Sequence, residues 1–262
     1  DIDSVIVSVP LYLHFEVTKA ALQAGKHVFC EKSLVFKPEE VHQLRELVKQ
    51  YPKQVVQVGL QRRYSQFYQV ARQMIEKGQL GEVTHIHAQW HRNPGWTMKP
   101  GGKGNMANWR LFKEYSGGLT AELASHQIDI ADWMFGASPE YVVGVGGLDW
   151  QKDGRDIFDN IQLIYKYPKG QKLVYSSITT NAHLPYLNSM RPEFGECIMG
   201  TKGALHMTVG DGEKTMPTGL WFVETDKTVA APAKAGEKEA ANSGASYTMA
   251  AGGRGLPILM DK

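Results

Sequence analysis

The sequence contains few of the residues on which disulfide-stapled or metal-centred folds depend. Its 262 residues include two cysteines, Cys30 and Cys197, which lie far apart and belong to no CxxC pair. A disulfide framework and a zinc site therefore have no support, and both cysteines are expected to be small buried side chains. The sequence also lacks an apolar run of the length that a bilayer-spanning helix needs, so no membrane partner is predicted.

The chain has little excess charge of either sign. Lys and Arg number 29, Asp and Glu number 27, and the formal net charge is +2. Such a balance gives no broad positive field, so nucleic acid is not an expected partner either. The first residues carry neither an initiator methionine nor a signal-like stretch, and location cannot be read from them. The length suits two compact domains or one large one, with room for an enclosed site.

The first 60 residues alternate between short aliphatic runs and amphipathic segments. The pattern predicts strands at residues 1–10, 27–30 and 54–60, with helices at 15–24 and 37–50. The first run is aliphatic along most of its length, which is typical of a strand covered on both faces. A strand-helix-strand-helix-strand order predicts a parallel, doubly wound sheet with right-handed crossovers.

From residue 67 onward the pattern changes. It predicts a helix at 67–79, a long strand at 83–90, a loop at 91–108, a helix at 119–133, and further strands at 141–146, 160–167, 172–179, 196–199, 204–209 and 220–224. Short Gly and Pro turns between these strands favour antiparallel pairing. We therefore predict a doubly wound parallel sheet over residues 1–64, which the resemblance given below implies to be part of a Rossmann domain. An open, mostly antiparallel sheet with helices on one face is expected over 65–262, with an irregular tail at 226–262.

Polar side chains follow each of the three predicted parallel strands. The residues at these three positions are Ser8, Val9, Pro10 and His14, then Glu31, Lys32 and Ser33, then Gln61, Arg62 and Arg63. Ligands of open α/β sheets bind beyond the carboxyl ends of the strands, so these residues are predicted to line one crevice. Lys32 is the most informative, because an ammonium there can hydrogen-bond a substrate hydroxyl beside a cofactor. A solvated surface lysine is an equally open interpretation.

The second candidate group is Glu122, His126 and Asp129. Spacings of four and three residues predict that these side chains share one helix face, where either carboxylate would orient the imidazole and raise its basicity. A core-facing histidine satisfied by a carboxylate is the alternative. No metal site is predicted, because a third committed ligand and its supporting hydrogen bonds cannot be identified.

The loop after the long strand combines rings with forked donors. Its members are His91, Arg92, Trp96, Asn108, Trp109 and Arg110. Such groups suit the apolar face and hydroxyl edge of a polyhydroxylated ligand, and they suit ordinary loop packing equally well. The glycine-rich runs VGVGGLD and AGGRG predict no phosphate site, since the first lacks the third glycine of GxGxxG and the second lacks GK[ST].

Three stretches resemble the Gfo/Idh/MocA oxidoreductases. They are VSVPLYLHFEVTKAALQAGKHVFCEKS at 7–33, VGLQRRYSQFYQVARQMIEKGQLGEV at 58–83 and SGGLTAELASHQIDIADWMFG at 116–136. The run GTKGAL at 200–205 resembles a recurrent turn in the family's large sheet, so the resemblance extends from residue 1 to about 225. Three positions depart from it: Ser33 and Gln66 stand where proline is usual, and Leu11 where asparagine is common.

The resemblance implies a Rossmann domain followed by a mostly antiparallel sheet domain, with NAD or NADP between them. At the matching positions, Lys32 contacts the reacting oxygen, His126 exchanges the hydroxyl proton, and Glu122 is the acidic residue four places before it. The remaining assignments are Ser8, Val9, Pro10, Leu11, His14, Glu31, Lys32 and Gln61 for the cofactor, and Arg63, Arg92, Trp109, Arg110 and Asp129 for the substrate. The family's GxGxxG turn is expected to lie before Asp1.

The implied activity is hydride transfer between NAD(P) and a hydroxyl-bearing carbon of a sugar, glycoside or polyol. One alternative is an NAD-dependent glycosidase or lyase that oxidises its sugar transiently. Another is a non-catalytic, dinucleotide-sensing regulatory protein, which the presence of both Lys32 and His126 disfavours. The expected partners are a small carbohydrate and, through the large sheet, further copies of the chain.

Overall fold

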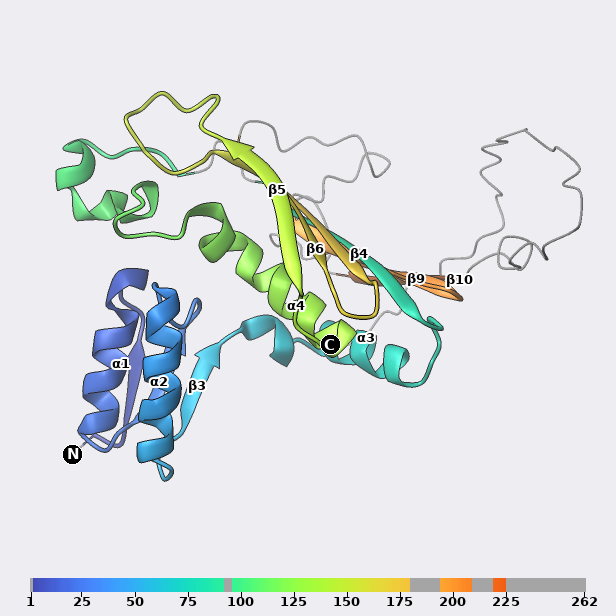
Figure 1. Cartoon of the computed structure of the whole chain (residues 1–262), viewed down its shortest axis with the longest axis horizontal. Helices are drawn as coiled ribbons and strands as arrows, with labels where there is room; N and C mark the ends of the chain where they lie inside the picture. The colour runs from blue at the N-terminus through green and yellow to red at the C-terminus, as the bar shows by residue number, and fades with distance from the viewer. Residues whose placement is uncertain (1, 92–95, 180–193, 209–218, 225–262) are drawn as a thin grey trace, which may run out of the picture.

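The computed structural model describes residues 2–91, 96–179, 194–208 and 219–224. These residues form two sheets, one with strand order β1-β2-β3 and one with order β10-β9-β8-β4-β7-β6-β5. The chain completes the smaller sheet first and then crosses to the larger one after β3 (Figure 1). Among the described residues, no helix is both long enough and apolar enough to cross a membrane.

The smaller sheet is parallel throughout, as predicted. Its elements are β1 (Ser4–Val7), the 3-10 turn η1 (Leu11–Leu13), α1 (His14–Gln23), β2 (His27–Glu31), α2 (Pro38–Gln50) and β3 (Val56–Gly59). Strand residues Val7 and Val28 pack against Leu22 of α1 and Leu44 of α2. Gly25 ends the α1 turn because its φ of 73° is one that glycine adopts without strain.

Only one face of this sheet is covered by the described residues. Both crossovers advance in the same direction along the strand order, which places α1 and α2 on the same face. On the other face Ile6 is 74% exposed and Phe29 is 37% exposed. The prediction that the first strand is covered on both faces is therefore wrong for the described part of the chain.

The larger sheet is mixed and mostly antiparallel. The elements after the crossing are η2 (Gln61–Tyr64), α3 (Gln66–Glu76), β4 (Val83–Trp90), η3 (Gly102–Gly104), η4 (Met106–Leu111), the π-helical turn η5 (Thr120–Ala124), α4 (Ser125–Phe135), β5 (Tyr141–Gly147), β6 (Asn160–Lys166), β7 (Lys172–Ile178), β8 (Phe194–Gly200), β9 (Gly203–Thr208) and β10 (Gly219–Glu224). Antiparallel ladders join every neighbouring pair except β4 and β7, which run parallel. The predicted fold class is confirmed.

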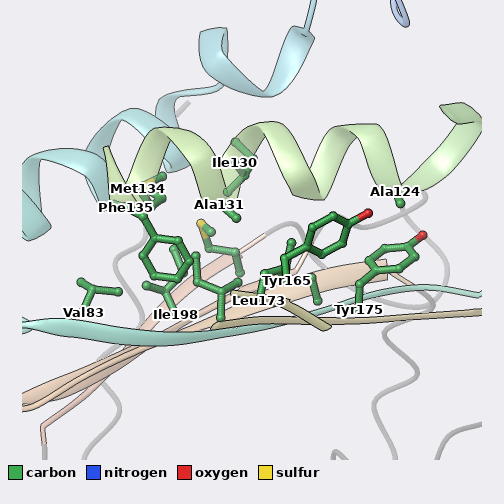
Figure 2. Close-up of a cluster of buried hydrophobic side chains, with 14 of the residues drawn as sticks. Val83, Ala124, Ile130, Ala131, Met134, Phe135, Tyr165, Leu173, Tyr175 and Ile198 are labelled. Carbon is green, nitrogen blue, oxygen red and sulfur yellow. The ribbon is translucent and has the colours of Figure 1, made fainter. Parts of the chain in front are cut away.

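The main core lies between this sheet and α3 and α4. Figure 2 shows Ile130, Met134 and Phe135 of α4 above Leu173 and Ile198 of the sheet, all of them buried. Full burial of a side chain of this kind contributes about 1.5–3 kcal/mol, so this layer fixes α4 firmly on the sheet. Because α4 carries His126, the core also fixes the position of the candidate imidazole.

Candidate active site

Lys32 joins the two sheets at the candidate site. It follows β2 directly, and its Nζ donates to the carbonyl oxygen of Glu122 at 2.6 Å and, more weakly, to that of Ala121 at 3.4 Å. Burial lowers the pKa of Lys32; the charge of Glu122 opposes this shift, and that of Arg110 reinforces it. The interpretation of Lys32 as a freely solvated surface lysine is therefore wrong.

The segment that receives Lys32 is a π-helical turn, Thr120–Ala124, which runs directly into α4. A π-turn contains one more residue than an α-helical turn and recurs at functional sites. Residues four apart across it therefore do not share a face as they would on a regular helix. The sequence pattern gives no sign of this extra residue.

The carboxylates of the second candidate group contact arginines and not the imidazole. Glu122 accepts from Arg110 Nε at 3.1 Å, and its side chain is 8% exposed. Asp129 accepts from Arg63, from Nε at 2.9 and 3.0 Å and from Nη2 at 2.7 Å. Among the described residues His126 Nδ1 has no hydrogen-bond partner. The prediction that either carboxylate orients the imidazole by a direct bond is wrong.

His126 is held by a ring contact instead. Its imidazole is buried and stacks on Trp90, with ring centroids 5.2 Å apart and an interplanar angle of 27°. Burial, with smaller contributions from the charges of Lys32 and Arg62, lowers the pKa of His126 to about 3. The imidazole is therefore neutral near pH 7. Lys32 Nζ bonds the carbonyl oxygen of Glu122, four residues before His126 along the same helical segment.

A buried ion pair lies next to the His126 stack. Arg62 pairs with Glu196, whose carboxylate also accepts from the hydroxyl of Tyr68 at 2.5 Å. The Arg62 guanidinium lies 5.3 Å from the centroid of the Trp90 ring, so it contacts the same ring as His126. Sequence reasoning gave Glu196 no role. The available signal was its position two residues before Ile198, which puts a carboxylate on the inward face of β8.

The carboxyl ends of the three parallel strands carry the predicted cofactor residues. Ser8, Glu31 and Gln61 are exposed there, and Val9 and Pro10 are half-buried. Such hydroxyl, carboxylate and amide groups can hydrogen-bond the hydroxyls of a dinucleotide, and the strand ends are where an open parallel sheet binds one. The described residues at this edge thus fit that group.

Two of the residues predicted for the cofactor have other surroundings. Leu11 is buried, at 2% exposed. His14 is also buried, and its two ring nitrogens lie 2.7 Å from the carbonyl oxygen of Ser33 and 2.9 Å from that of Val9. Both nitrogens face carbonyl oxygens of the protein itself, so His14 lies between two strand-end loops.

The loop residues differ in exposure, because Trp109 and Asn108 are buried and Arg110 is not. Arg110 lies 4.2 Å from the ring centroid of Trp109 and 5.7 Å from that of Trp96, and its side chain is 43% exposed, so it remains reachable. Asn108 is buried, and its amide bonds Lys99 and Gly102 within the loop. Arg92 lies outside the described residues.

His91 does not belong to a metal-binding cluster in the part of the chain that the structure describes. The His91 Nδ1 accepts from the backbone N–H of Ile178 at 3.1 Å, and burial lowers its pKa to about 4. Within the described residues, no group of three or more His, Cys, Asp and Glu side chains could hold a metal ion.

Two family profiles match successive parts of the chain. A family profile described as the oxidoreductase family, NAD-binding Rossmann fold, matches residues 1–60. A second, described as the GFO/IDH/MocA C-terminal domain, matches residues 68–206. An uncharacterized oxidoreductase of Schizosaccharomyces pombe is 31% identical over 205 residues, which are 78% of this chain and 52% of that protein.

Two further relatives carry more specific descriptions. The levoglucosan dehydrogenase of Pseudarthrobacter phenanthrenivorans is 31% identical over 138 residues, covering 52% of this chain and 34% of that protein. The crystal structure of an inositol dehydrogenase homolog from Azotobacter vinelandii, complexed with NADH and myo-inositol, matches with a TM-score of 0.68 and 26% identity over 84% of this chain and 53% of that one. The chain thus spans roughly half the length of the first relatives it matches.

Proposed function

We infer, because this chain belongs to the Gfo/Idh/MocA family, that it carries the reacting centre of an NAD(P)-dependent oxidoreductase. The substrate class is a sugar, glycoside or polyol that is oxidised or reduced at a hydroxyl-bearing carbon. The observation that carries this proposal is the bond from Lys32 Nζ to the carbonyl oxygen of Glu122, which holds the amine of the first sheet unit on the helical segment that carries His126.

Lys32 and His126 have complementary roles in the proposed reaction. A bound nicotinamide ring supplies the hydride acceptor. As the C–H bond breaks, the hydroxyl-bearing carbon becomes a carbonyl carbon, and the hydroxyl proton leaves to His126. That hydroxyl becomes strongly acidic as negative charge leaves the carbon, so even a weakly basic, neutral imidazole accepts its proton. Lys32 donates a hydrogen bond to the same oxygen and holds it in place.

Other side chains bind the two reactants. Ser8, Glu31 and Gln61 offer polar groups to the dinucleotide at the strand ends. Arg110, whose side chain is 43% exposed, offers a forked donor to a polyhydroxylated substrate, and the buried Trp109 ring against which it lies holds the guanidinium in place. The names of the levoglucosan dehydrogenase and of the myo-inositol complex support this substrate class.

The proposal is tested by following the absorbance of reduced cofactor with a panel of cyclic polyols, aldoses and anhydrosugars. We expect turnover with at least one of them and a loss in kcat of about 10²–10⁴-fold in Lys32→Ala and in His126→Ala. Lys26→Ala, which changes a lysine of the same segment, serves as the matched control and keeps full activity. Wild-type turnover in the Lys32→Ala, His126→Ala double variant would contradict the assignment. Glycoside cleavage with no net change in reduced cofactor would point to transient oxidation.

We further propose that copies of the chain associate through the large sheet. Its edge strand β5 exposes Val142, Val143 and Val145, the last at 72% exposed, and the neighbouring Ile164 of β6 is 44% exposed. An apolar sheet edge of this kind is a surface that proteins generally cover. A second copy would bury these side chains.

A further inference from the structure

The carbonyl oxygen of Ala121 is a shared acceptor between the two sheet units. It accepts from Ser33 Oγ at 3.0 Å and from Ser125 Oγ at 2.7 Å, while Lys32 Nζ lies at the longer distance of 3.4 Å. Ser33 belongs to the loop after β2, and Ser125 begins α4. Because the π-turn departs from the regular helical ladder, its carbonyls are available to partners outside the helix.

The same loop is held from its other side by His14. The buried imidazole contacts the carbonyl oxygen of Ser33 through Nδ1 and that of Val9 through Nε2, at 2.7 and 2.9 Å. The Ser33 loop therefore lies between His14, which contacts the backbone carbonyl of Ser33, and Ala121, whose carbonyl oxygen accepts from the Ser33 hydroxyl. Lys32 immediately precedes Ser33 in this loop.

We propose that Ser33 is a positioning residue for Lys32. Its hydroxyl fixes the loop on the Ala121 carbonyl, and this keeps the Lys32 amine on the Glu122 carbonyl at 2.6 Å, in the π-turn that leads into the helix of His126. The catalytic consequence rests on the function proposed above, whereas the structural one does not. Proline, which is usual at this position in the family, has no hydroxyl, so the bond is a property of this chain.

The first readout is the titration of the Lys32 amine and needs no turnover. Reductive methylation with ¹³C-formaldehyde labels the lysines, and the Lys32 signal is the one that disappears in Lys32→Arg. Burial is the main cause of the lowered pKa of Lys32. Ser33→Ala releases the loop and admits water to the amine, so we expect the pKa to move upward, toward that of an ordinary lysine.

The second readout is kinetic. Loss of one hydrogen bond worth about 1 kcal/mol corresponds to a roughly fivefold change in rate, so kcat in Ser33→Ala should fall by about five- to tenfold. KM should change little, since the Ser33 hydroxyl bonds the Ala121 carbonyl and is not among the groups proposed to bind either reactant. Ser33→Thr keeps the hydroxyl and should restore both readouts. Ser33→Cys, which keeps the size but donates weakly, should behave like Ser33→Ala and replaces it if the alanine variant fails to fold.

The matched control is Ser125→Ala, which removes the shorter bond to the same carbonyl without touching the Lys32 loop. Both its Lys32 titration and its kcat should equal those of the wild type. An unchanged Lys32 titration in Ser33→Ala, or an equal change in Ser125→Ala, would overturn the proposal. If no substrate is turned over but the Lys32 pKa still moves only in the Ser33 variants, the positioning role stands and the proposed function fails.

Discussion

Removing the carboxylate of Glu196 should produce one of the largest losses of stability available in this chain. In Glu196→Gln the Arg62 guanidinium stays buried, with its side chain only 7% exposed, but loses its counter-charge. The glutamine still offers a carbonyl oxygen to the hydroxyl of Tyr68. The variant therefore measures the contribution of the ion pair without removing the Tyr68 hydrogen bond. Breaking a buried pair from one side costs about 3–5 kcal/mol of unfolding free energy. In a domain of this size that is a fall in Tm of about 6–20 °C.

The assay is urea unfolding followed by circular dichroism, arranged as a double-mutant cycle with Arg62→Met. The double variant contains neither charge. Its loss of unfolding free energy should therefore be smaller than the sum of the losses in the two single variants by about 2 kcal/mol or more. The neighbouring pair Arg63 and Asp129 is the control. Its arginine side chain is 40% exposed, and Arg63→Met should cost about 1 kcal/mol or less. Additive losses at Arg62 and Glu196 would refute the reasoning.

The remaining predictions concern pH and association. His126 and His91 have folded pKa values of about 3 and about 4 against 6.5 in the unfolded chain. Below pH 6.5 the unfolded state therefore binds protons that the folded state does not, and stability should fall by about 2–3 kcal/mol per histidine between pH 6.5 and pH 4.5. The free energy of unfolding, measured with urea at several pH values in this range, should fall less steeply with decreasing pH in His126→Gln than in the wild type. An equally steep fall in this variant would contradict the lowered pKa of His126. Val145→Asp places a charge on the exposed β5 edge and should lower the mass measured by light scattering; an oligomer that survives it would exclude that edge as the contact.

The order of helices and strands could be predicted because it depends on local periodicity. The strand expected at 83–90 is observed as β4, Val83–Trp90, and the helix expected at 37–50 is observed as Pro38–Gln50. The parallel pairing of β4 with β7 could not be predicted. It depends on which distant strand enters between β4 and β6, and short turns between sequential strands carry no information on that point.

The sequence predicted which residues belong to the candidate site better than it predicted which residues they contact. Lys32 and His126 were identified from a strand end and a helix, and Lys32 bonds the π-turn that leads into the helix of His126. The partners of Glu122 and Asp129 were missed because they are arginines, one of them 66 positions away. The extra residue of the π-turn also has no counterpart in the apolar pattern, so the spacing of four was interpreted as a shared helix face.

The anchoring of Lys32 on backbone carbonyls affects how this protein can be recombined with its relatives. The amine belongs to the first sheet unit, and the oxygens that hold it belong to the second. Backbone oxygens are supplied by any sequence, but only a turn of the right shape presents them. A chimera that exchanges one unit must therefore inherit the geometry of residues 120–124, and choosing the same side chains is not sufficient.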